Sequence, residues 1–237
     1  MKIKAVLFDL DGTLLPQDQD VFVETYFRAL SRRFADRYAP DALIAAVWHG
    51  TEAMMANDGS RTNEQAFWKA FAERLGEVAQ ADKAEFDRFY REEFNTVQAV
   101  CGFNPLVPAT IARLHEQGFR LILATNPIFP YEAAVSRAAW AGIELSDFEW
   151  ITTYENSRYS KPNPLYYQDI ADQAGLPPEA CLMVGNDVGD DMAAARIGMR
   201  VFLLTDCLIN KTDESVDRYP HGGFAELCRY IDECNEP

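Results

Sequence analysis

Residues 3–15 read IKAVLFDLDGTLL, an apolar and β-branched run that ends in two aspartates one residue apart. A run of this kind, closed by Asp11-Gly12, predicts a buried strand that leads into a turn. A turn would account for one aspartate and the glycine. It does not explain why Asp9 and Asp11 lie together beside a core strand, because two carboxylates repel each other unless a cation is present. The pair therefore predicts a divalent-metal site at the end of the first strand.

The chain that follows this strand has its apolar residues at helical spacing up to about residue 96. Helices are predicted around residues 21–34, 43–49, 65–75 and 83–94, with breaks near Pro40, Gly59 and Gly76. The interval contains no convincing strand. We therefore predict a small α-helical domain inserted at residues 17–96.

The second half of the chain alternates apolar strand-like runs with helix-like runs. The predicted strands are residues 119–125, 149–153, 180–184 and 200–205, and the predicted helices are residues 108–117, 131–140, 164–174, 190–197 and 224–233. Strands joined by helices require right-handed crossovers, so the sheet is predicted to be parallel with helices on both faces. The prediction is an α/β, doubly wound (Rossmann-like) core domain formed by residues 1–16 and 97–237.

Polar residues directly follow several of the predicted strands. They are Asp9, Asp11, Thr125, Asn126, Asn186 and Asp187. Ligands of doubly wound folds bind at the carboxyl ends of the strands. The site is therefore expected there.

The composition excludes several classes of partner. The net charge is −15, with 37 acidic against 22 basic residues, which disfavours binding to nucleic acid and to anionic lipid. The five cysteines are odd in number and have no zinc-site spacing, which favours reduced thiols. No signal peptide is recognised and the longest apolar runs are too short to cross a bilayer, so we expect a soluble cytoplasmic protein.

Residues 8–15, FDLDGTLL, resemble the first motif of the haloacid dehalogenase-like hydrolases, whose pattern DxDGT is matched residue for residue. The resemblance implies that Asp9 attacks phosphorus and forms an aspartyl-phosphate. It also implies that Asp11 protonates the leaving oxygen and later deprotonates water. Asp9 and Asp11 would both contribute to a Mg²⁺ site, Asp11 through its backbone carbonyl.

Two further segments match the family's second and third motifs. Thr125 and Asn126 end an apolar run and could simply be a strand end or a helix cap. Lys161, in SKPNP at residues 160–164, could be a solvated loop lysine, although the two prolines stiffen the segment. The resemblance implies that Thr125, Asn126 and Lys161 bind the phosphoryl group, and that Lys161 also pairs with Asp9.

Residues 184–191, VGNDVGDD, correspond to the fourth motif but depart from it, because Asn186 stands where the family has its first aspartate. A capped helix with acids in its first turn would also explain the pattern. Since Mg²⁺ prefers carboxylate oxygens, we predict Asp187 and then Asp191 as metal ligands. Asp190 and Asn186 stay open as alternatives.

The predicted function is a Mg²⁺-dependent phosphatase that acts on a small phosphorylated metabolite, with residues 17–96 as a C1-type cap. A phosphomutase and another hydrolase of the family are the alternatives, although dehalogenation does not need Asp11. A non-catalytic binding protein is disfavoured because Asp9, Asp11 and Lys161 are all present, and a response-regulator-like phosphoacceptor lacks the insert and Asp11. Residues 49–63 either contact the leaving group or merely connect helices. A monomer and a homodimer are both open.

Overall fold

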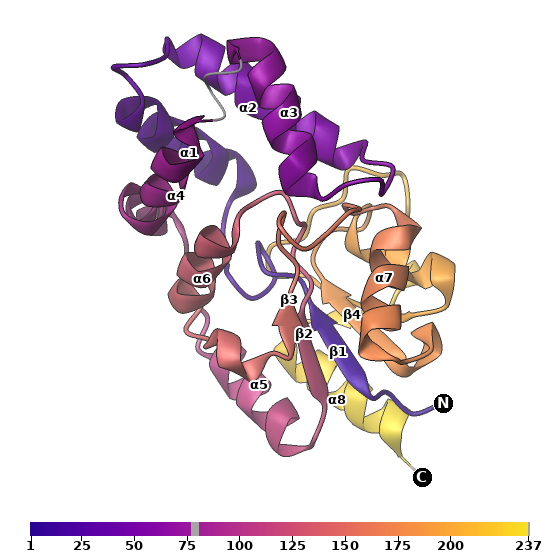
Figure 1. Ribbon diagram of the computed structural model, residues 1–237. Coiled ribbons are helices and arrows are strands. Elements are labelled where there is room, and N and C mark those ends of the chain that lie inside the picture. The colour runs from indigo at the N-terminus through magenta and orange to yellow at the C-terminus, as the bar shows by residue number, and fades with distance from the viewer. Residues whose placement is uncertain (77–80, 237) are drawn as a thin grey trace.

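The computed structural model describes residues 1–76 and 81–236, and within them six strands form one parallel sheet with helices on both sides (Figure 1). The strands are β1 (Ala5–Phe8), β2 (Arg120–Leu123), β3 (Trp150–Ile151), β4 (Cys181–Gly185), β5 (Arg200–Leu204) and β6 (His221–Gly222). Their order is β3-β2-β1-β4-β5-β6. This confirms the predicted doubly wound α/β fold.

The register of the central strands determines where the functional loops start. Phe8, the last residue of β1, lies opposite Leu123 of β2 on one side and Val184 of β4 on the other. The loops that follow these three strands therefore leave the sheet at the same edge. Parallel register brings together residues that are more than a hundred positions apart in sequence.

Several strands are shorter than predicted. β1 ends at Phe8 rather than Leu10, because the Leu10 carbonyl already accepts the amides of Thr13, Leu14 and Leu15 in the following turn. β3 comprises two residues where residues 149–153 were predicted. β6 was not predicted, since a two-residue edge strand has no apolar run to signal it.

Helices cover both faces of the sheet. They are α5 (Leu106–Glu116), α6 (Tyr131–Trp140), α7 (Pro164–Ala174) and α8 (Phe224–Asn235), with short 3-10 helices η3 (Leu145–Asp147), η4 (Pro178–Ala180), η5 (Asp191–Ile197) and η6 (Val216–Arg218). Val6 and Phe8 belong to one core cluster together with residues of α5 and α8, whereas Ala5 and Leu7 belong to a second cluster together with residues of α7. The alternation arises because successive strand residues point to opposite faces.

The predicted helix at residues 190–197 is a 3-10 helix. Its turns are closed by i to i+3 hydrogen bonds, such as those from Ala193 to Asp190 and from Gly198 to Ala195. It ends at Gly198, whose φ of 90° is a left-handed conformation that favours glycine.

The interval between β1 and α5 is helical, as predicted. It contains α1 (Gln19–Arg33), α2 (Pro40–Met55), α3 (Asn63–Leu75), α4 (Lys83–Arg91) and the 3-10 helix η2 (Glu93–Val100). The predicted helix at residues 83–94 is divided at Glu92, whose φ and ψ of −109° and −81° are not helical. The predicted domain boundary at residue 96 falls inside η2, and residues 77–80 of the predicted insert lie outside the described residues.

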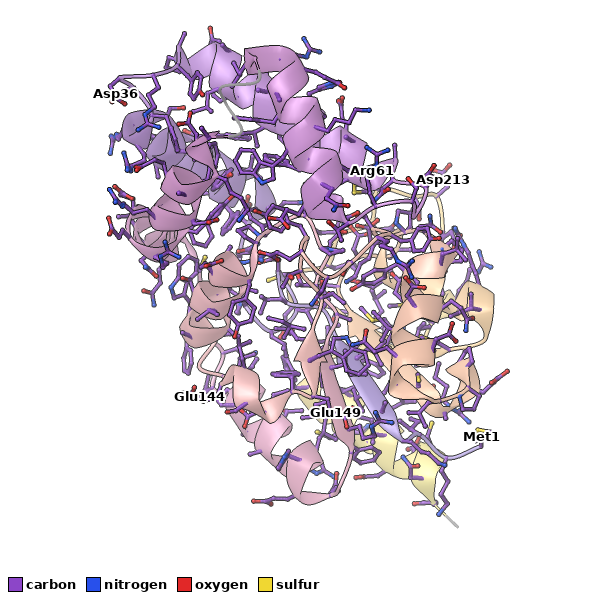
Figure 2. The ribbon with its side chains drawn as sticks, in the orientation of Figure 1. Met1, Asp36, Arg61, Glu144, Glu149 and Asp213 are labelled. Carbon is purple, nitrogen blue, oxygen red and sulfur yellow. The ribbon has the colours of Figure 1, made fainter. Side chains whose placement is uncertain are left out.

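The helical group stands at one end of the molecule (Figure 1). Figure 2 labels Asp36 on the outer side of this group, away from Met1 and Glu149, which lie in the part of the molecule that contains the sheet. The two connections to the sheet run side by side, because the Gly102 amide donates to the Pro16 carbonyl at 2.7 Å and Gln17 pairs with Cys101. Among the helices that the structure describes, none has the length and apolarity needed to cross a membrane.

Candidate active site

The predicted site residues come from four separate segments that meet beyond the carboxyl ends of β1, β2 and β4. Asp9 directly follows β1, and its amide donates to the Val184 carbonyl of β4 at 2.9 Å. On the other side, the Ala124 amide donates to the Phe8 carbonyl at 2.7 Å. Lys161 enters from the loop that precedes α7. The sheet therefore brings the first, third and fourth motifs into direct contact.

The Asp9 carboxylate is held at both oxygens. Its Oδ1 accepts from Lys161 Nζ at 2.8 Å, and its Oδ2 lies 3.0 Å from the Thr13 hydroxyl. The same hydroxyl lies 2.9 Å from Asn186 Oδ1. Gly12 has a φ of 80°, and a Cβ at this position would come within 2.3 Å of the Asn186 amide. The turn thus needs glycine for both its conformation and its contact with Asn186.

Lys161 is not a solvated loop lysine. Its side chain is 1% exposed, and Nζ lies 2.7 Å from Asp191 Oδ1 as well as 2.8 Å from Asp9. Burial opposes its charge, but the carboxylates of Asp191 and Asp9 outweigh burial and raise the pKa of Lys161 well above its ordinary value. The ammonium is therefore a fixed positive charge beside Asp9.

The fourth motif is held by contacts within its own loop. Asp191 Oδ2 accepts from the Asp187 amide at 3.0 Å, so that both oxygens of Asp191 are engaged. Asp187 Oδ1 accepts from the amides of Gly189 and Asp190 at 2.7 and 3.0 Å. Burial raises the pKa of Asp191 to about 7 and that of Asp190 to about 6. Two side chains of this motif share a hydrogen-bond partner with Asp9: Asn186 shares the Thr13 hydroxyl, and Asp191 shares Lys161 Nζ.

Asp11 is held by a residue that sequence reasoning missed. Its Oδ2 forms an ion pair with Arg137 of α6, a side chain only 1% exposed. Arg137 also donates from Nε to the Ala133 carbonyl at 3.1 Å, and its guanidinium lies 4.6 Å from the centre of the Phe129 ring. Asp11 Oδ1 is buried and has no hydrogen-bond partner among the described residues. Burial raises the pKa of Asp11, although Arg137 opposes this effect.

A sequence signal for Arg137 exists in the helix that carries it. Within YEAAVSRAAW, the buried positions are Ala133, Ala134, Arg137, Ala138 and Trp140. An arginine on the apolar face of a helix is seldom fully buried unless it has a partner. That pattern predicts a buried acidic partner but does not say which one.

The two residues of the second motif, Thr125 and Asn126, have different surroundings. Asn126 Oδ1 accepts from the Lys161 amide at 3.2 Å, which joins the second and third motifs. Thr125 is 3% exposed, and its carbonyl accepts from the Tyr166 hydroxyl at 2.9 Å. Asn126 lines the central cavity of the molecule, whereas Thr125 is not among the described residues that do so.

This cavity has a volume of about 220 Å³ and lies between the motif loops and the inserted helices. Thr51 of α2 lines it, and the nearby Asn63 is fully buried at the start of α3. The Asn63 amide donates to the Pro127 carbonyl at 3.0 Å and to the Ser160 hydroxyl at 3.1 Å. The segment formed by residues 49–63 therefore contacts both the second-motif loop and the third-motif loop.

The donor set at this site suits a hard cation. Five carboxylates line the cavity, from Asp9, Asp11, Asp187, Asp190 and Asp191, whereas Lys161 and the Arg137 behind Asp11 supply two positive charges. Within the described residues, however, no three His, Cys, Asp or Glu side chains are grouped as metal ligands. A cation here would need the Asn186 amide oxygen, a backbone carbonyl or water. Mg²⁺ fits, because it binds through one or two carboxylates and keeps several waters.

The chain is similar to known hydrolases over most of its length. A family model described as haloacid dehalogenase-like hydrolase matches residues 3–198. The pyrophosphatase PpaX of Anoxybacillus flavithermus is 25% identical over 84% of this chain and 82% of its own. The phosphoglycolate phosphatase of Aliivibrio fischeri is 29% identical over 86% and 84%.

Solved structures agree on the fold. A 2-haloacid dehalogenase from Pseudomonas syringae superposes with a TM-score of 0.62 at 21% identity, covering 98% of this chain and 99% of its own. CbbY from Rhodobacter sphaeroides, solved in complex with phosphate, gives a TM-score of 0.60 at 21% identity and covers 95% and 96%. At these identities the similarity shows the shared architecture alone.

Proposed function

Because the chain belongs to the haloacid dehalogenase-like hydrolase family, we propose that it is a Mg²⁺-dependent phosphatase that releases phosphate from a small phosphorylated metabolite. It is a hydrolase that acts on phosphoric monoester bonds. This agrees with relatives that are named as phosphatases and that align with most of this chain. The observation that carries the proposal is the Asp9 carboxylate, buried against Lys161 with Asp11 two residues away.

The proposed first step is attack by an Asp9 oxygen on phosphorus. The new O–P bond gives an aspartyl-phosphate, and the bond from phosphorus to the leaving oxygen breaks. Lys161 offsets the negative charge that gathers on the phosphoryl oxygens. The Thr125 hydroxyl and Asn126 are proposed to bind the same oxygens. Asn126 is already joined to the Lys161 backbone, which supports this assignment.

Asp11 is proposed to supply the proton that the leaving oxygen needs, and to accept a proton from water in the second step. In that step water attacks phosphorus, inorganic phosphate leaves and the Asp9 carboxylate is restored. Burial raises the pKa of Asp11, which is the direction that proton donation requires. Because Arg137 occupies Oδ2, we assign the transferred proton to Oδ1. Arg137 thus acts as a positioning residue for the acid.

The proposed Mg²⁺ would be held by Asp9, the Asp11 carbonyl, the Asn186 amide oxygen and Asp187. When bound, the ion would offset the surplus of negative charge so that a phosphate dianion can approach. Asp191 was also predicted as a ligand, but it already accepts from Lys161 and from the Asp187 amide. We therefore favour Asp191 as the group that fixes Lys161.

We further propose that residues 17–96 form a cap domain on a core of residues 1–16 and 97–237. The adjacent connections at Pro16 and Gly102 would be its hinges. A cap suits this chemistry because water must be excluded during attack on phosphorus and admitted afterwards. The contacts of Asn63 with the two motif loops would hold the cap closed.

The test is phosphate release from a panel of phosphorylated metabolites, with Mg²⁺ present and again after chelation by EDTA. We expect release from at least one compound, dependent on the metal and lost in Asp9→Asn. If the wild-type protein releases no more phosphate than Asp9→Asn with every compound, the proposed function is wrong.

A further inference from the structure

The wall of the cavity that faces the inserted helices is aromatic. Its rings come from α1, α2, α3 and α4 and from the loops that follow β2 and β3. They are Phe22, Tyr26, Phe27, Trp48, Phe67, Trp68, Phe86, Tyr90, Phe129 and Tyr154. Val23, Val47 and Ile128 fill the spaces between them. A leaving group that projects from the phosphate site toward the helices therefore meets ring faces and edges rather than water.

The charges around the cavity are distributed unevenly. Among the described residues that line it, Lys161 is the only cation, and it already lies against Asp9 and Asp191. Five carboxylates line the same space. A leaving group with its own carboxylate or phosphate would find no cation on the helical side, and burying such a charge without a partner is costly.

The helical side does offer neutral hydrogen-bonding groups. The hydroxyls of Tyr26 and Tyr90 lie 2.8 Å apart, and burial raises the pKa of Tyr26 to about 12, so that it stays neutral. The Trp68 indole N–H is buried beside the Tyr154 hydroxyl and makes no hydrogen bond of normal geometry among the described residues. Buried polar groups normally find partners, so this donor is suited to an uncharged acceptor on a ligand.

The size of the cavity suits a ring. Its volume of about 220 Å³ exceeds the roughly 150 Å³ of an apolar protein cavity that takes up benzene. Aromatic walls favour planar ligands, which stack on ring faces or meet ring edges.

Resting on the proposed phosphatase activity, we propose that the substrates are phosphomonoesters of an uncharged alcohol bearing an aromatic or similarly planar apolar group. A leaving group with a second anionic group is then disfavoured. The proposed substrate class differs from the phosphoglycolate and pyrophosphate for which two relatives of this chain are named.

The test compares benzyl phosphate with 4-carboxybenzyl phosphate, which have the same leaving alcohol chemistry and differ by one carboxylate. With Mg²⁺ present, kcat/KM for benzyl phosphate is expected to exceed that for 4-carboxybenzyl phosphate by roughly tenfold or more. Phosphoglycolate and acetyl phosphate complete the panel as small substrates without a ring. Benzyl phosphate is expected to exceed phosphoglycolate as well.

A second experiment introduces a positive charge into the cavity. Thr51 is half-buried on α2 and lines the cavity. Among the described residues, its hydroxyl bonds only its own helix, at the Val47 carbonyl. Thr51→Lys supplies the missing cation, so it is expected to raise kcat/KM for 4-carboxybenzyl phosphate relative to benzyl phosphate by roughly tenfold. Thr51→Met, of similar length and without charge, is the matched control and is expected to keep the wild-type ratio.

The outcomes separate this inference from the proposed function. Hydrolysis of acetyl phosphate or phosphoglycolate without preference for benzyl phosphate would leave the phosphatase standing and overturn the inference. A wild-type preference that is unchanged by Thr51→Lys would also overturn it, because the discrimination would not arise from charge in this cavity. No hydrolysis of any of these four compounds would overturn the inference, whereas the proposed phosphatase activity fails only if the wider panel of metabolites also gives no release above that of Asp9→Asn.

Discussion

Arg137 and Asp11 form an ion pair between residues 126 positions apart, joining α6 to the loop that follows β1. The arginine side chain is 1% exposed, and its guanidinium also lies over the ring of Phe129. A buried arginine of this kind binds one oxygen of the carboxylate in a defined orientation. The pair therefore holds Oδ2 of Asp11 against Arg137 and leaves Oδ1 without a hydrogen-bond partner among the described residues.

Replacing Arg137 should impair proton donation more than substrate binding. Arg137→Met is expected to lower kcat for benzyl phosphate by roughly 10²-fold with little change in KM, because Arg137 does not line the cavity. The loss should be smaller for 4-nitrophenyl phosphate, whose leaving oxygen hardly needs a proton. Steady-state kinetics with both esters measure this difference.

Two further variants control for a structural effect of the same change. Arg137→Lys keeps the charge and should recover part of kcat. Arg113→Met removes a partly exposed arginine paired with Asp232 and should leave kcat unchanged. If kcat falls equally for 4-nitrophenyl phosphate and benzyl phosphate, Arg137 supports the fold and does not position Asp11 for proton donation.

Asp9→Asn should abolish turnover without unfolding the protein. An amide oxygen is a poor nucleophile toward phosphorus, and loss of a nucleophile costs on the order of 10⁴-fold or more in kcat. Phosphate release and circular dichroism are the measurements. Asp213→Asn, at an exposed aspartate (Figure 2), is the matched control and should behave as wild type. Turnover by Asp9→Asn above a trace level would show that another residue attacks phosphorus.

Turnover should require Mg²⁺ and be inhibited by Ca²⁺. Calcium accepts more ligands in looser geometry, so the attacking carboxylate can chelate it instead of approaching phosphorus in line. Binding of Mg²⁺ to the folded state should also raise Tm, which reports on the site independently of turnover. Full activity after exhaustive chelation would contradict the prediction.

The thermal shift can be assigned to the fourth motif. Asp187→Asn should reduce the increase in Tm produced by Mg²⁺, whereas Asp206→Asn, at an exposed aspartate, should not. If Asp187→Asn leaves the shift in Tm unchanged, Asp187 is not needed to bind the ion, and Asp9, Asp11 and Asn186 hold it.

Within residues 49–63, substitution of Met55 should change which compounds are hydrolysed while leaving the Mg²⁺-induced shift in Tm nearly unchanged. Met55 is 40% exposed at the end of α2, and its sulfur lies 3.9 Å from the Asn126 amide nitrogen. Met55→Ala is expected to change the ratio of kcat/KM between benzyl phosphate and acetyl phosphate. Asp58→Ala, in the exposed turn that follows α2, is the control. An unaltered profile in Met55→Ala would assign the segment to helix connection alone.

The sequence by itself predicted the fold class and the place of the site. Apolar runs such as residues 119–125 and helices such as 131–140 and 164–174 follow from local periodicity, because strand and helix repeats are encoded within a few residues. Parallel strands end at one edge, so the polar residues that follow the strands had to gather there. Lys161 does not follow a strand, and its pairing with Asp9 was implied by the family resemblance; the structure shows this contact.

Only the tertiary structure decided how the charges pair and what the cavity contains. Arg137 of α6 could have paired with any acid, and Lys161 proved to lie as close to Asp191 as to Asp9. Aromatic residues at helical spacing in α1 to α4 predict a packed core, yet eight rings from these helices also line the cavity. Such contacts depend on how elements far apart in sequence pack against each other. Charge pairing and cavity shape are set by distances between side chains, and these distances produce no periodic pattern in the sequence.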